Sequence, residues 1–558
     1  MNDISTPARA TGTTRQSVPV PRTSVFDGLA VSARRFPERS AIHYYGSDTS
    51  YSTLLEQAEA LAGYLQQDCG VKRGDRVLLF LQNSPQFIIG YYAILRADAV
   101  VVPVNPMNLT EELEHYVEDA GASVVLCGAE LIDRVAPLLA PGKLSRAIVA
   151  AYGDYFKRAA TKLPVPDVVS AKALALNYPG MVAWRDALHA GRTPGPHLAE
   201  PDDLAVMPYT SGTTGRPKGC MHTHHTLMAV IGVAGALHGV FSADTLLAVA
   251  PFFHITGMQM TMNTAIYQGA TLVVMTRWDR EAALELIERL GISVWIAIPT
   301  MVIDLLGSPN VSREKLASLR HMSGGGIAMP EAVAKKLHAL TGLEFIEAYG
   351  MTETAAPTHT NPLDKPKRQC LGVPIFNTHA LVIDQSSGAV LGPDEVGEIV
   401  SSGPQVFKGY WNNPEATRSS FIDIDGRRYF RTGDLAKVDG EGYFFMVDRL
   451  KRMINASGYK VWPAEVEAML YNHPQIQEAC VIASKDDKRG ETVKALVVLK
   501  RGSDDARAAV DDILSWAKEH MATYKAPRIV EILDVLPKSG TGKILWRELQ
   551  ERENKTQT

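Results

Sequence analysis

The chain has 558 residues, a formal net charge of -4, 46% hydrophobic residues and five cysteines. Its length exceeds one ordinary hydrophobic core, so we expect a large layered domain or several domains. The weak charge excludes the basic field of a nucleic-acid-binding protein. The cysteines form no Cys-x-x-Cys pair, which favours reduced thiols in the cytoplasm over disulfides or a zinc site. No run of about eighteen apolar residues appears, so we expect no integral membrane segment.

Residues 1–24 are rich in Thr, Ser, Pro and Arg and lack the apolar core of a secretory signal, which predicts a flexible tail. From Phe26 onward, helical stretches such as 51–65 alternate with short apolar runs, a pattern typical of a largely parallel α/β sheet. We therefore predict an α/β domain of layered β-sheets and helices over residues 25–448. Its predicted strands are 76–81, 99–104, 246–249, 270–275, 294–298 and 344–346.

The alternation is interrupted between about 153 and 200, where proline-containing text predicts an insertion over the surface. Contact of this segment with lipid is a weaker alternative. About a hundred residues suffice for an independent small domain, so residues 453–558 are predicted to form a mobile α+β C-terminal domain on a hinge at 449–452. Its predicted elements are strands at 479–483 and 495–499 and a helix at 508–521.

The stretch 209–219 (Tyr-Thr-Ser-Gly-Thr-Thr-Gly-Arg-Pro-Lys-Gly) concentrates hydroxyls, glycines and one lysine. Backbone N–H groups at glycines, hydroxyl donors and a cation together suit phosphate oxygens. The loop differs from the Walker type, because Pro217 precedes Lys218 and Gly219 follows it. An ordinary polar turn is the alternative. The predicted phosphate-binding positions are Thr210, Ser211, Gly212, Thr213, Thr214, Gly215 and Lys218.

This loop resembles the signature of the adenylate-forming enzymes, the superfamily of acyl-CoA synthetases, beetle luciferases and peptide-synthetase adenylation domains. Further blocks follow in the family's order and cover the chain from about Phe26 to Glu548. The resemblance implies a large N-terminal domain that includes a small β-barrel-like subdomain, followed by a small C-terminal domain on a hinge. The blocks are 251–257, 349–354, 429–435, 448–454 and 537–543.

An acid is activated when its carboxylate attacks the α-phosphorus of ATP, so the protein must align two anions and absorb the developing charge. The resemblance implies that Lys543 bridges the substrate carboxylate and the α-phosphate. It implies that Glu353 holds Mg²⁺, as a hard carboxylate suits a hard cation, and that Thr352 contacts the α-phosphate. The alternatives are a solvated lysine in a turn and an ordinary helix cap.

The resemblance also assigns the nucleoside site. Asp434 accepts hydrogen bonds from both ribose hydroxyls, Arg449 approaches the same ribose, and Tyr349 lies along the adenine. The glycine turn that begins at Gly324 and Gly325 allows the backbone to come close to the base and to the acyl group.

The resemblance places His254 near the acyl carboxylate. Amino-acid-activating relatives carry an Asp nearby for the substrate ammonium, and the segment 252–255 has none, which favours an uncharged acyl chain. A structural histidine is the alternative at this position. A metal site at the histidines of 222–225 is not predicted, because no Cys or acidic cluster accompanies them. The predicted acyl pocket includes Phe253, Thr256, Trp295 and Gly326.

Capture of the acyl-adenylate by a thiol requires Lys543 to leave and a channel to open in its place, which a rotation of the C-terminal domain achieves. The resemblance places Lys451 at the hinge. Arg452, where many relatives are acidic, either favours the phosphates of CoA or faces solvent. The residues expected to line the CoA channel are Ser457, Gly458 and Tyr459.

The leading prediction is an ATP-dependent acyl-CoA synthetase that converts a carboxylic acid, medium- or long-chain fatty acid first, into acyl-CoA, AMP and pyrophosphate. The implied cofactors are ATP, Mg²⁺ and CoA. Short thioether, branched or aromatic acids stay open as substrates, and an acyl-AMP ligase that loads a separate carrier protein is the second hypothesis. A nucleotide-binding sensor is the non-enzyme alternative. The oligomeric state, including a homodimer, stays open.

Overall fold

The computed structural model describes residues 17–157, 163–171, 176, 178–210, 217–449, 452–456, 459–486, 490–500, 506–539 and 543–556. The apolar runs predicted near the N-terminus form the centre of a seven-stranded sheet, in which β3 and β4 pair in parallel. The parallel pairing follows from the helix between them, which returns the chain to the same edge. In spatial order the strands are β11 (His222–Thr223), β8 (Leu204–Val206), β4 (Val100–Pro103), β3 (Arg76–Phe80), β5 (Val124–Gly128), β6 (Arg146–Ala150) and β7 (Met181–Ala183).

A second, nine-stranded sheet contains the later predicted strands. Its centre is parallel from β1 to β16, and its two edges are antiparallel. The strand predicted at 344–346 extends to residue 351, because its second half pairs with β17. In spatial order the strands are β18 (Val373–Pro374), β17 (Ala356–Thr360), β16 (Phe345–Met351), β15 (His321–Gly325), β14 (Val294–Ala297), β12 (Thr245–Ala248), β13 (Thr271–Val274), β1 (Ser40–Tyr44) and β2 (Ser47–Ser50).

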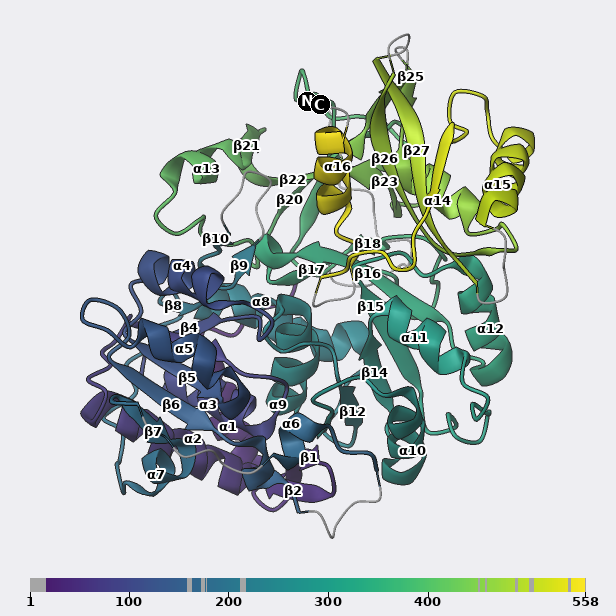
Figure 1. Ribbon diagram of the computed structural model, residues 1–558. Coiled ribbons are helices and arrows are strands. Elements are labelled where there is room, and N and C mark those ends of the chain that lie inside the picture. The colour runs from purple at the N-terminus through teal and green to yellow at the C-terminus, as the bar shows by residue number, and fades with distance from the viewer. Residues whose placement is uncertain are drawn as a thin grey trace.

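Helices separate and cover the two sheets, as Figure 1 shows. The largest core combines buried residues of both sheets with those of the inner helices, so these helices lie between the sheets. Smaller cores lie beneath the outer helices of each sheet. The inner helices are α1 (Val25–Arg35), α2 (Tyr51–Gln67), α3 (Pro85–Arg96), α8 (His224–His238), the π-helix η5 (Gly257–Asn263) and α9 (Thr264–Gln268). The outer helices are α4 (Thr110–Ala120), α5 (Ile132–Val135), α10 (Arg280–Leu290), α11 (Pro299–Leu306) and α12 (Glu331–Thr341).

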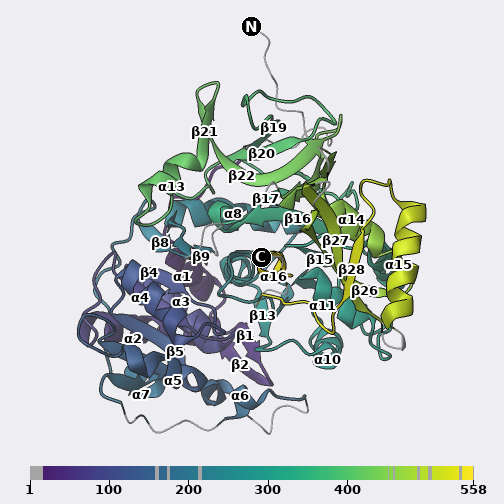
Figure 2. The ribbon, with the colours of Figure 1, turned by 45° about the horizontal axis from the view of Figure 1, so that its top comes forward.

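Two smaller units complete the predicted architecture. The barrel-like subdomain is a five-stranded antiparallel sheet of β19 (His379–Ile383), β20 (Gly397–Ser402), β22 (Arg427–Val438), β21 (Phe421–Ile424) and β23 (Phe444–Arg449), with α13 (Pro414–Ser419). The C-terminal domain lies beside the end of the nine-stranded sheet where β15 and β16 end (Figure 2). It contains β24 (Ile454–Ala456), β25 (Tyr459–Val461), α14 (Pro463–Leu470), β26 (Ile476–Asp486), β27 (Gly490–Leu499), α15 (Ala506–His520), β28 (Ile529–Ile532) and α16 (Trp546–Thr556).

Two segments predicted to be peripheral pack against the rest of the structure. Within 153–200, the predicted surface insertion, β7 extends the seven-stranded sheet and α7 (Trp184–His189) places Trp184 in the main core at 1% exposure. Within 1–24, the predicted tail, Val18 exchanges two backbone hydrogen bonds with the Asn377 side chain. Both corrections have the same cause. A short segment without clear hydrophobic periodicity gives no signal of a strand or helix, yet it can still pack against the folded domain.

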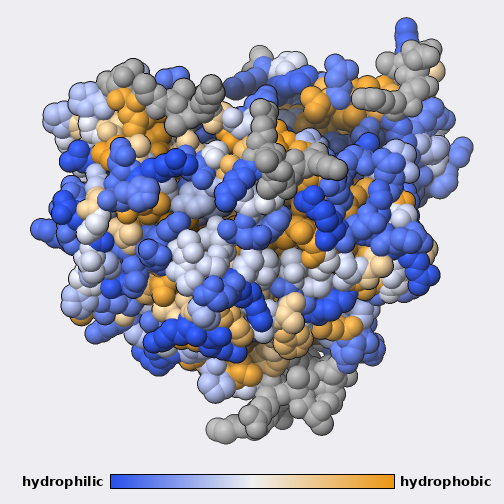
Figure 3. Space-filling view, turned by 90° about the horizontal axis from the view of Figure 1, so that it is seen from below, coloured by the Kyte–Doolittle hydropathy of each residue, from blue (hydrophilic) through white to orange (hydrophobic). Residues whose placement is uncertain are grey.

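The surface seen from below mixes charged and apolar side chains without a continuous apolar band (Figure 3). Within the part of the chain that the structure describes, no helix combines the length and the apolar character that a bilayer crossing requires.

Candidate active site

The predicted phosphate-binding loop connects two short paired strands. β9 (Tyr209–Thr210) pairs with β10 (Lys218–Gly219), so Thr210 lies opposite Lys218. The Tyr209 hydroxyl donates to Asp119 at 2.6 Å and fixes the base of this hairpin to α4. Outside the described residues lie the predicted positions at its tip, Ser211, Gly212, Thr213, Thr214 and Gly215.

Three consecutive glycines at the end of β15 have three different neighbours. A Cβ at Gly324 would lie 1.8 Å from a backbone oxygen of β14, and one at Gly325 would lie 2.2 Å from a backbone oxygen of β16. Gly326 has φ +93°, and its Cβ would lie 3.2 Å from Cε of Lys543. The flanking strands therefore require the first two glycines, whereas the third opens toward the catalytic lysine predicted in the C-terminal domain.

His254 lies in the turn that leads into η5. The Thr256 N–H donates to its Nδ1 at 3.3 Å, and the Met258 N–H donates to its carbonyl oxygen at 3.0 Å. Burial, with the nearby Lys543 ammonium, lowers the pKa of His254 to about 3, so the imidazole is neutral at physiological pH. Because Nδ1 accepts, the proton lies on Nε2, which can donate to a carboxylate or phosphate oxygen.

Thr352 and Glu353 follow β16 in the short 3₁₀ turn η6 (Thr352–Thr354). The His222 Nε2 donates to the carbonyl oxygen of Thr352 at 2.7 Å, so this histidine ties β11 to the turn. The Tyr410 hydroxyl donates to Glu353 Oε1 at 2.9 Å, and Lys218 Nζ lies 5.2 Å from the centroid of the Tyr410 ring. The sequence alone does not point to Tyr410, because one aromatic residue outside the recognised blocks carries no distinguishing signal.

Two of the residues predicted for the ribose and the adenine contact each other. The Tyr349 hydroxyl donates to Asp434 Oδ2 at 2.7 Å, and Asp434 is 2% exposed. Arg449 lies directly opposite Asp434 across the β22–β23 pair. The His359 ring packs against Tyr349 with the centroids 5.7 Å apart, and burial lowers its pKa to about 3. A neutral imidazole therefore packs against Tyr349, the residue predicted to lie along the adenine.

The predicted acyl-pocket residues separate into two groups. Phe253 and Thr256 flank His254 and are partly exposed. Trp295 is fully buried beneath α10 and α11, where it stacks on Trp278 with the ring centroids 5.6 Å apart. Side chains alternate along β14, so Ile296 points to the other face and joins the core that contains η5. The structure thus places Trp295 in the core beneath α10 and α11, and Ile296 in the core that contains η5.

Several hinge and CoA-channel positions have a limited description. Lys451, Ser457 and Gly458 lie outside the described residues, and Tyr459 begins β25. The Arg452 guanidinium neither faces solvent nor is left unpaired for a phosphate of CoA. It is 12% exposed, forms an ion pair with Glu467, and donates to a backbone carbonyl of β26 at 3.1 Å. Burial of a charge requires a partner, and Glu467 supplies it within the same domain.

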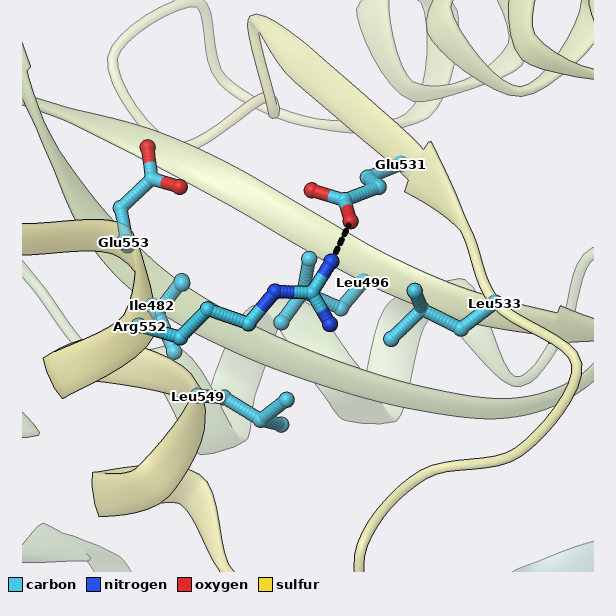
Figure 4. Close-up of a pocket in the computed structure, with 7 residues that line it drawn as sticks. All are labelled: Ile482, Leu496, Glu531, Leu533, Leu549, Arg552 and Glu553. Atoms are coloured by element: carbon cyan, nitrogen blue, oxygen red, sulfur yellow. Dashed lines mark hydrogen bonds and ion pairs between the residues drawn. The ribbon is translucent and has the colours of Figure 1, made fainter. Parts of the chain in front are cut away.

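The turn that carries Lys543 is anchored on both sides. Ser539 and Lys543 exchange hydrogen bonds of 2.8 and 3.2 Å. Helix α16 follows at once and is held to β26 and β27 by the buried Glu553, which bonds to Lys494 at 2.6 Å and to Ser484 at 2.8 Å. Figure 4 shows this contact region, a small pocket beside Glu531, Arg552 and Glu553. The pocket is part of the contact that holds α16 to β26 and β27. Lys543 itself reaches Gly326 of the large domain.

Comparisons with known proteins identify the family. The AMP-binding enzyme family matches residues 29–411, and the AMP-binding enzyme C-terminal domain matches 465–543. A long-chain-fatty-acid–CoA ligase of Bacillus subtilis (strain 168) is 34% identical over 96% of both chains. A feruloyl-CoA synthase of Amycolatopsis sp is 35% identical over 93% of this chain and 97% of its own.

Among solved structures, ATP-bound MatB from Rhodopseudomonas palustris has a TM-score of 0.84 at 27% identity and covers 96% of this chain and 100% of its own. The apo structure of MatB has a TM-score of 0.73. The chain belongs to the AMP-binding enzyme family. Within that family it is an adenylate-forming enzyme of the acyl-CoA synthetase branch, an AMP-forming acid–thiol ligase that uses ATP and CoA.

A residue not singled out by the sequence, Asn83, holds the turn that carries His254. Its amide donates to the Ala250 carbonyl at 3.0 Å and accepts from the Phe252 N–H at 2.8 Å. We expect Asn83→Ala to lower kcat/KM for adenylation about tenfold, because loss of buried hydrogen bonds of about 1–3 kcal/mol lets the turn shift. Pyrophosphate release with saturating ATP measures the effect.

Gln86 provides the matched control for Asn83. It is also a buried amide at the start of α3, and it donates to the Ala151 carbonyl at 2.8 Å, away from the His254 turn. Gln86→Ala should lower stability comparably while keeping kcat/KM. An equal loss of adenylation in both variants would contradict the positioning of the turn by Asn83.

Five buried histidines and the partly buried His254 make stability depend on pH. Burial lowers their pKa values to about 3 or 4, below the usual 6.5, so they bind protons only after unfolding. The free energy of unfolding should therefore fall as the pH drops from 6.5 to 4, by up to about 1.4 kcal/mol per pH unit for each histidine. The histidines are His222, His224, His238, His254, His321 and His359.

Proton uptake on unfolding, measured by calorimetry in two buffers at pH 5.0 and 7.5, tests this pH dependence. We expect an uptake of several protons at pH 5.0 and almost none from these groups at pH 7.5. His238→Leu should remove about one proton from the uptake at pH 5.0. A Tm that stays constant between these pH values would contradict the linkage.

Proposed function

We propose that this acyl-CoA synthetase activates a medium- or long-chain fatty acid through an acyl-adenylate, which then transfers its acyl group to CoA. The proposal rests mainly on the apolar character of the segments that adjoin His254. Ile296 and η5 belong to one continuous hydrophobic core. Homologues named long-chain-fatty-acid–CoA ligase support the same class of acid.

The geometry suits the first half-reaction. Lys543, at Gly326, and the neutral His254 face a common position from two domains, so both can meet the carboxylate as it attacks the α-phosphorus. Lys218 and Thr210 sit at the base of the phosphate hairpin, while Asp434 and Tyr349 suit the nucleoside. The Glu353 carboxylate, held by a tyrosine hydroxyl, fits Mg²⁺, which neutralises charge on phosphate oxygens when bound.

A separate arrangement is needed for the second half-reaction. Lys543 lies against Gly326, and a thiol cannot enter through the space that the lysine side chain fills. We infer that the C-terminal domain rotates about 449–452 once the adenylate forms, which brings the segment 457–459 to the CoA channel. The higher similarity to ATP-bound than to apo MatB supports an adenylate-forming arrangement here.

An aromatic acid is the second candidate, favoured by the feruloyl-CoA synthase relatives and by polar groups on η5. Gln259 and Asn263 on η5 are fully buried, together with Tyr91 and Tyr92 of α3. Asn263 donates to Gln259 at 2.6 Å and to Tyr91 at 2.9 Å, and it accepts from Tyr92 at 2.9 Å. These groups satisfy one another, so we favour a structural role for them and a fatty acid as the substrate.

Mass spectrometry of the enzyme with Mg-ATP and a mixture of fatty, branched, thioether and aromatic acids, with and without CoA, tests the proposal. We expect acyl-CoA masses of C8 to C18 fatty acids with stoichiometric AMP. Aryl-CoA as the dominant product would select the second candidate. Acyl-AMP that accumulates and ignores CoA would indicate a carrier protein as acceptor, and AMP binding without pyrophosphate release would indicate a sensor.

A further inference from the structure

Tyr410 joins the two opposite charges of the phosphate site. Its hydroxyl donates to Glu353 Oε1 at 2.9 Å, and Lys218 Nζ lies 5.2 Å from the centroid of its ring. Tyr410 lies between β20 and α13 of the barrel-like subdomain, whereas Glu353 and Lys218 belong to the α/β core. One side chain from a separate subdomain therefore contacts both charged groups.

The backbone holds Tyr410 in this place. The segment 407–411 runs antiparallel to 219–221, the end of the phosphate hairpin, with Cys220 opposite Tyr410. Tyr410 also donates its N–H to the Thr417 hydroxyl at 2.9 Å. The ring packs edge-on against Phe407, with the centroids 4.9 Å apart. Four backbone hydrogen bonds of 2.8–3.0 Å complete the contact: Lys408 to Met221, Met221 to Gly409, Trp411 to Gly219 and Phe407 to Glu353.

A carboxylate that binds a metal loses entropy unless its rotamer is already fixed, and outer hydrogen bonds commonly fix it. The Tyr410 hydroxyl is such a donor, since it holds one carboxylate oxygen and so orients the other. Because the backbone around Tyr410 is hydrogen-bonded to the end of the phosphate hairpin, the position of the hairpin also sets the position of the Tyr410 hydroxyl.

We propose that Tyr410 is a positioning residue that orients Glu353 for the metal bound with ATP and keeps it in register with Lys218. This inference rests on the proposed role of Glu353 as a metal ligand. It adds the barrel-like subdomain to the metal and phosphate site.

Tyr410→Phe isolates the hydroxyl, because the ring that contacts Lys218 and Phe407 remains. We expect Mn²⁺·ATP, measured by electron paramagnetic resonance of Mn²⁺, to bind about 10- to 100-fold more weakly. Binding of metal-free ATP by calorimetry should change less than twofold. Tyr443→Phe is the matched control, and it should keep Mn²⁺·ATP affinity. The buried Tyr443 lies between β22 and β23 of the barrel-like subdomain and donates at 2.7 Å to the carbonyl of Lys365, in the loop between β17 and β18.

A double-mutant cycle with Glu353→Gln separates this inference from the proposed function. We expect Tyr410→Phe to add no further loss in the Glu353→Gln background, because the hydroxyl acts through the carboxylate. Additive losses, or a Tyr410→Phe that matches Tyr443→Phe, would overturn the role of Tyr410 alone. Normal Mn²⁺·ATP binding by Glu353→Gln would overturn the metal assignment itself, and the inference with it.

Discussion

Lys543→Ala should reduce the rate of acyl-adenylate formation by about 10²- to 10³-fold, comparable to the loss of one electrostatic donor from a catalytic site. The reason is geometric, since Lys543 reaches Gly326 from a different domain and lies close enough to His254 to lower the pKa of that imidazole. The C-terminal domain thus brings the Lys543 charge to a site to which the large domain contributes Lys218. Pyrophosphate release from ATP and acid measures this half-reaction.

The same variant should retain most of the second half-reaction, in which supplied acyl-AMP reacts with CoA, because Lys543 has to leave before the thiol enters. Lys538→Ala is the matched control. Lys538 lies in the same turn but pairs with Glu478 at 2.5 Å, so its loss should spare both half-reactions. Equal losses of adenylation and thioester formation in Lys543→Ala would falsify the role assigned to Lys543.

Gly324→Ala should lower the free energy of unfolding by at least about 3 kcal/mol, the upper end of ordinary overpacking. A methyl group at this position would lie 1.8 Å from a backbone oxygen of β14, and backbone in the centre of a sheet cannot move aside. Strands β14 and β15 would separate at the edge that carries the active site. Denaturant unfolding, with ATP binding as a second measurement, tests both consequences.

Gly440→Ala provides the control, because no atom lies within 4 Å of the added methyl group and the backbone there is not left-handed. It should unfold within about 0.5 kcal/mol of the parent chain. A Gly324→Ala protein with unchanged stability would show that β14 and β15 can move apart without cost. The glycines would then have to be explained by ligand approach alone.

The agreement between predicted and observed strands has a physical basis. Strands such as β3, β12 and β14 were predicted because a buried parallel strand is apolar on both faces, a property of four or five consecutive residues. The same property hides which face a residue occupies. Trp295 was therefore predicted for the acyl pocket, although it faces the core beneath α10 and α11. Ile296, its neighbour, lies on the other side.

Charged residues show the same difference. Lys543, Glu353 and Asp434 were predicted from recognised blocks, because each block is a short local signal. The burial of Arg452 was not predicted, since its partner Glu467 lies fifteen residues away on α14 and only the folded domain brings them together. The role of Tyr410 depends in the same way on a contact between two subdomains.

The sequence by itself determined the layered α/β class and the family, and it predicted most of the charged groups proposed for ATP, because apolar periodicity and contiguous motifs are local properties. Only the tertiary structure decided where these groups meet. It brought Lys543 to Gly326, Tyr410 to Glu353 and Asn83 to the His254 turn. These contacts join residues far apart in the chain, and a distance between such residues is set by packing of whole elements, which no single stretch of sequence contains.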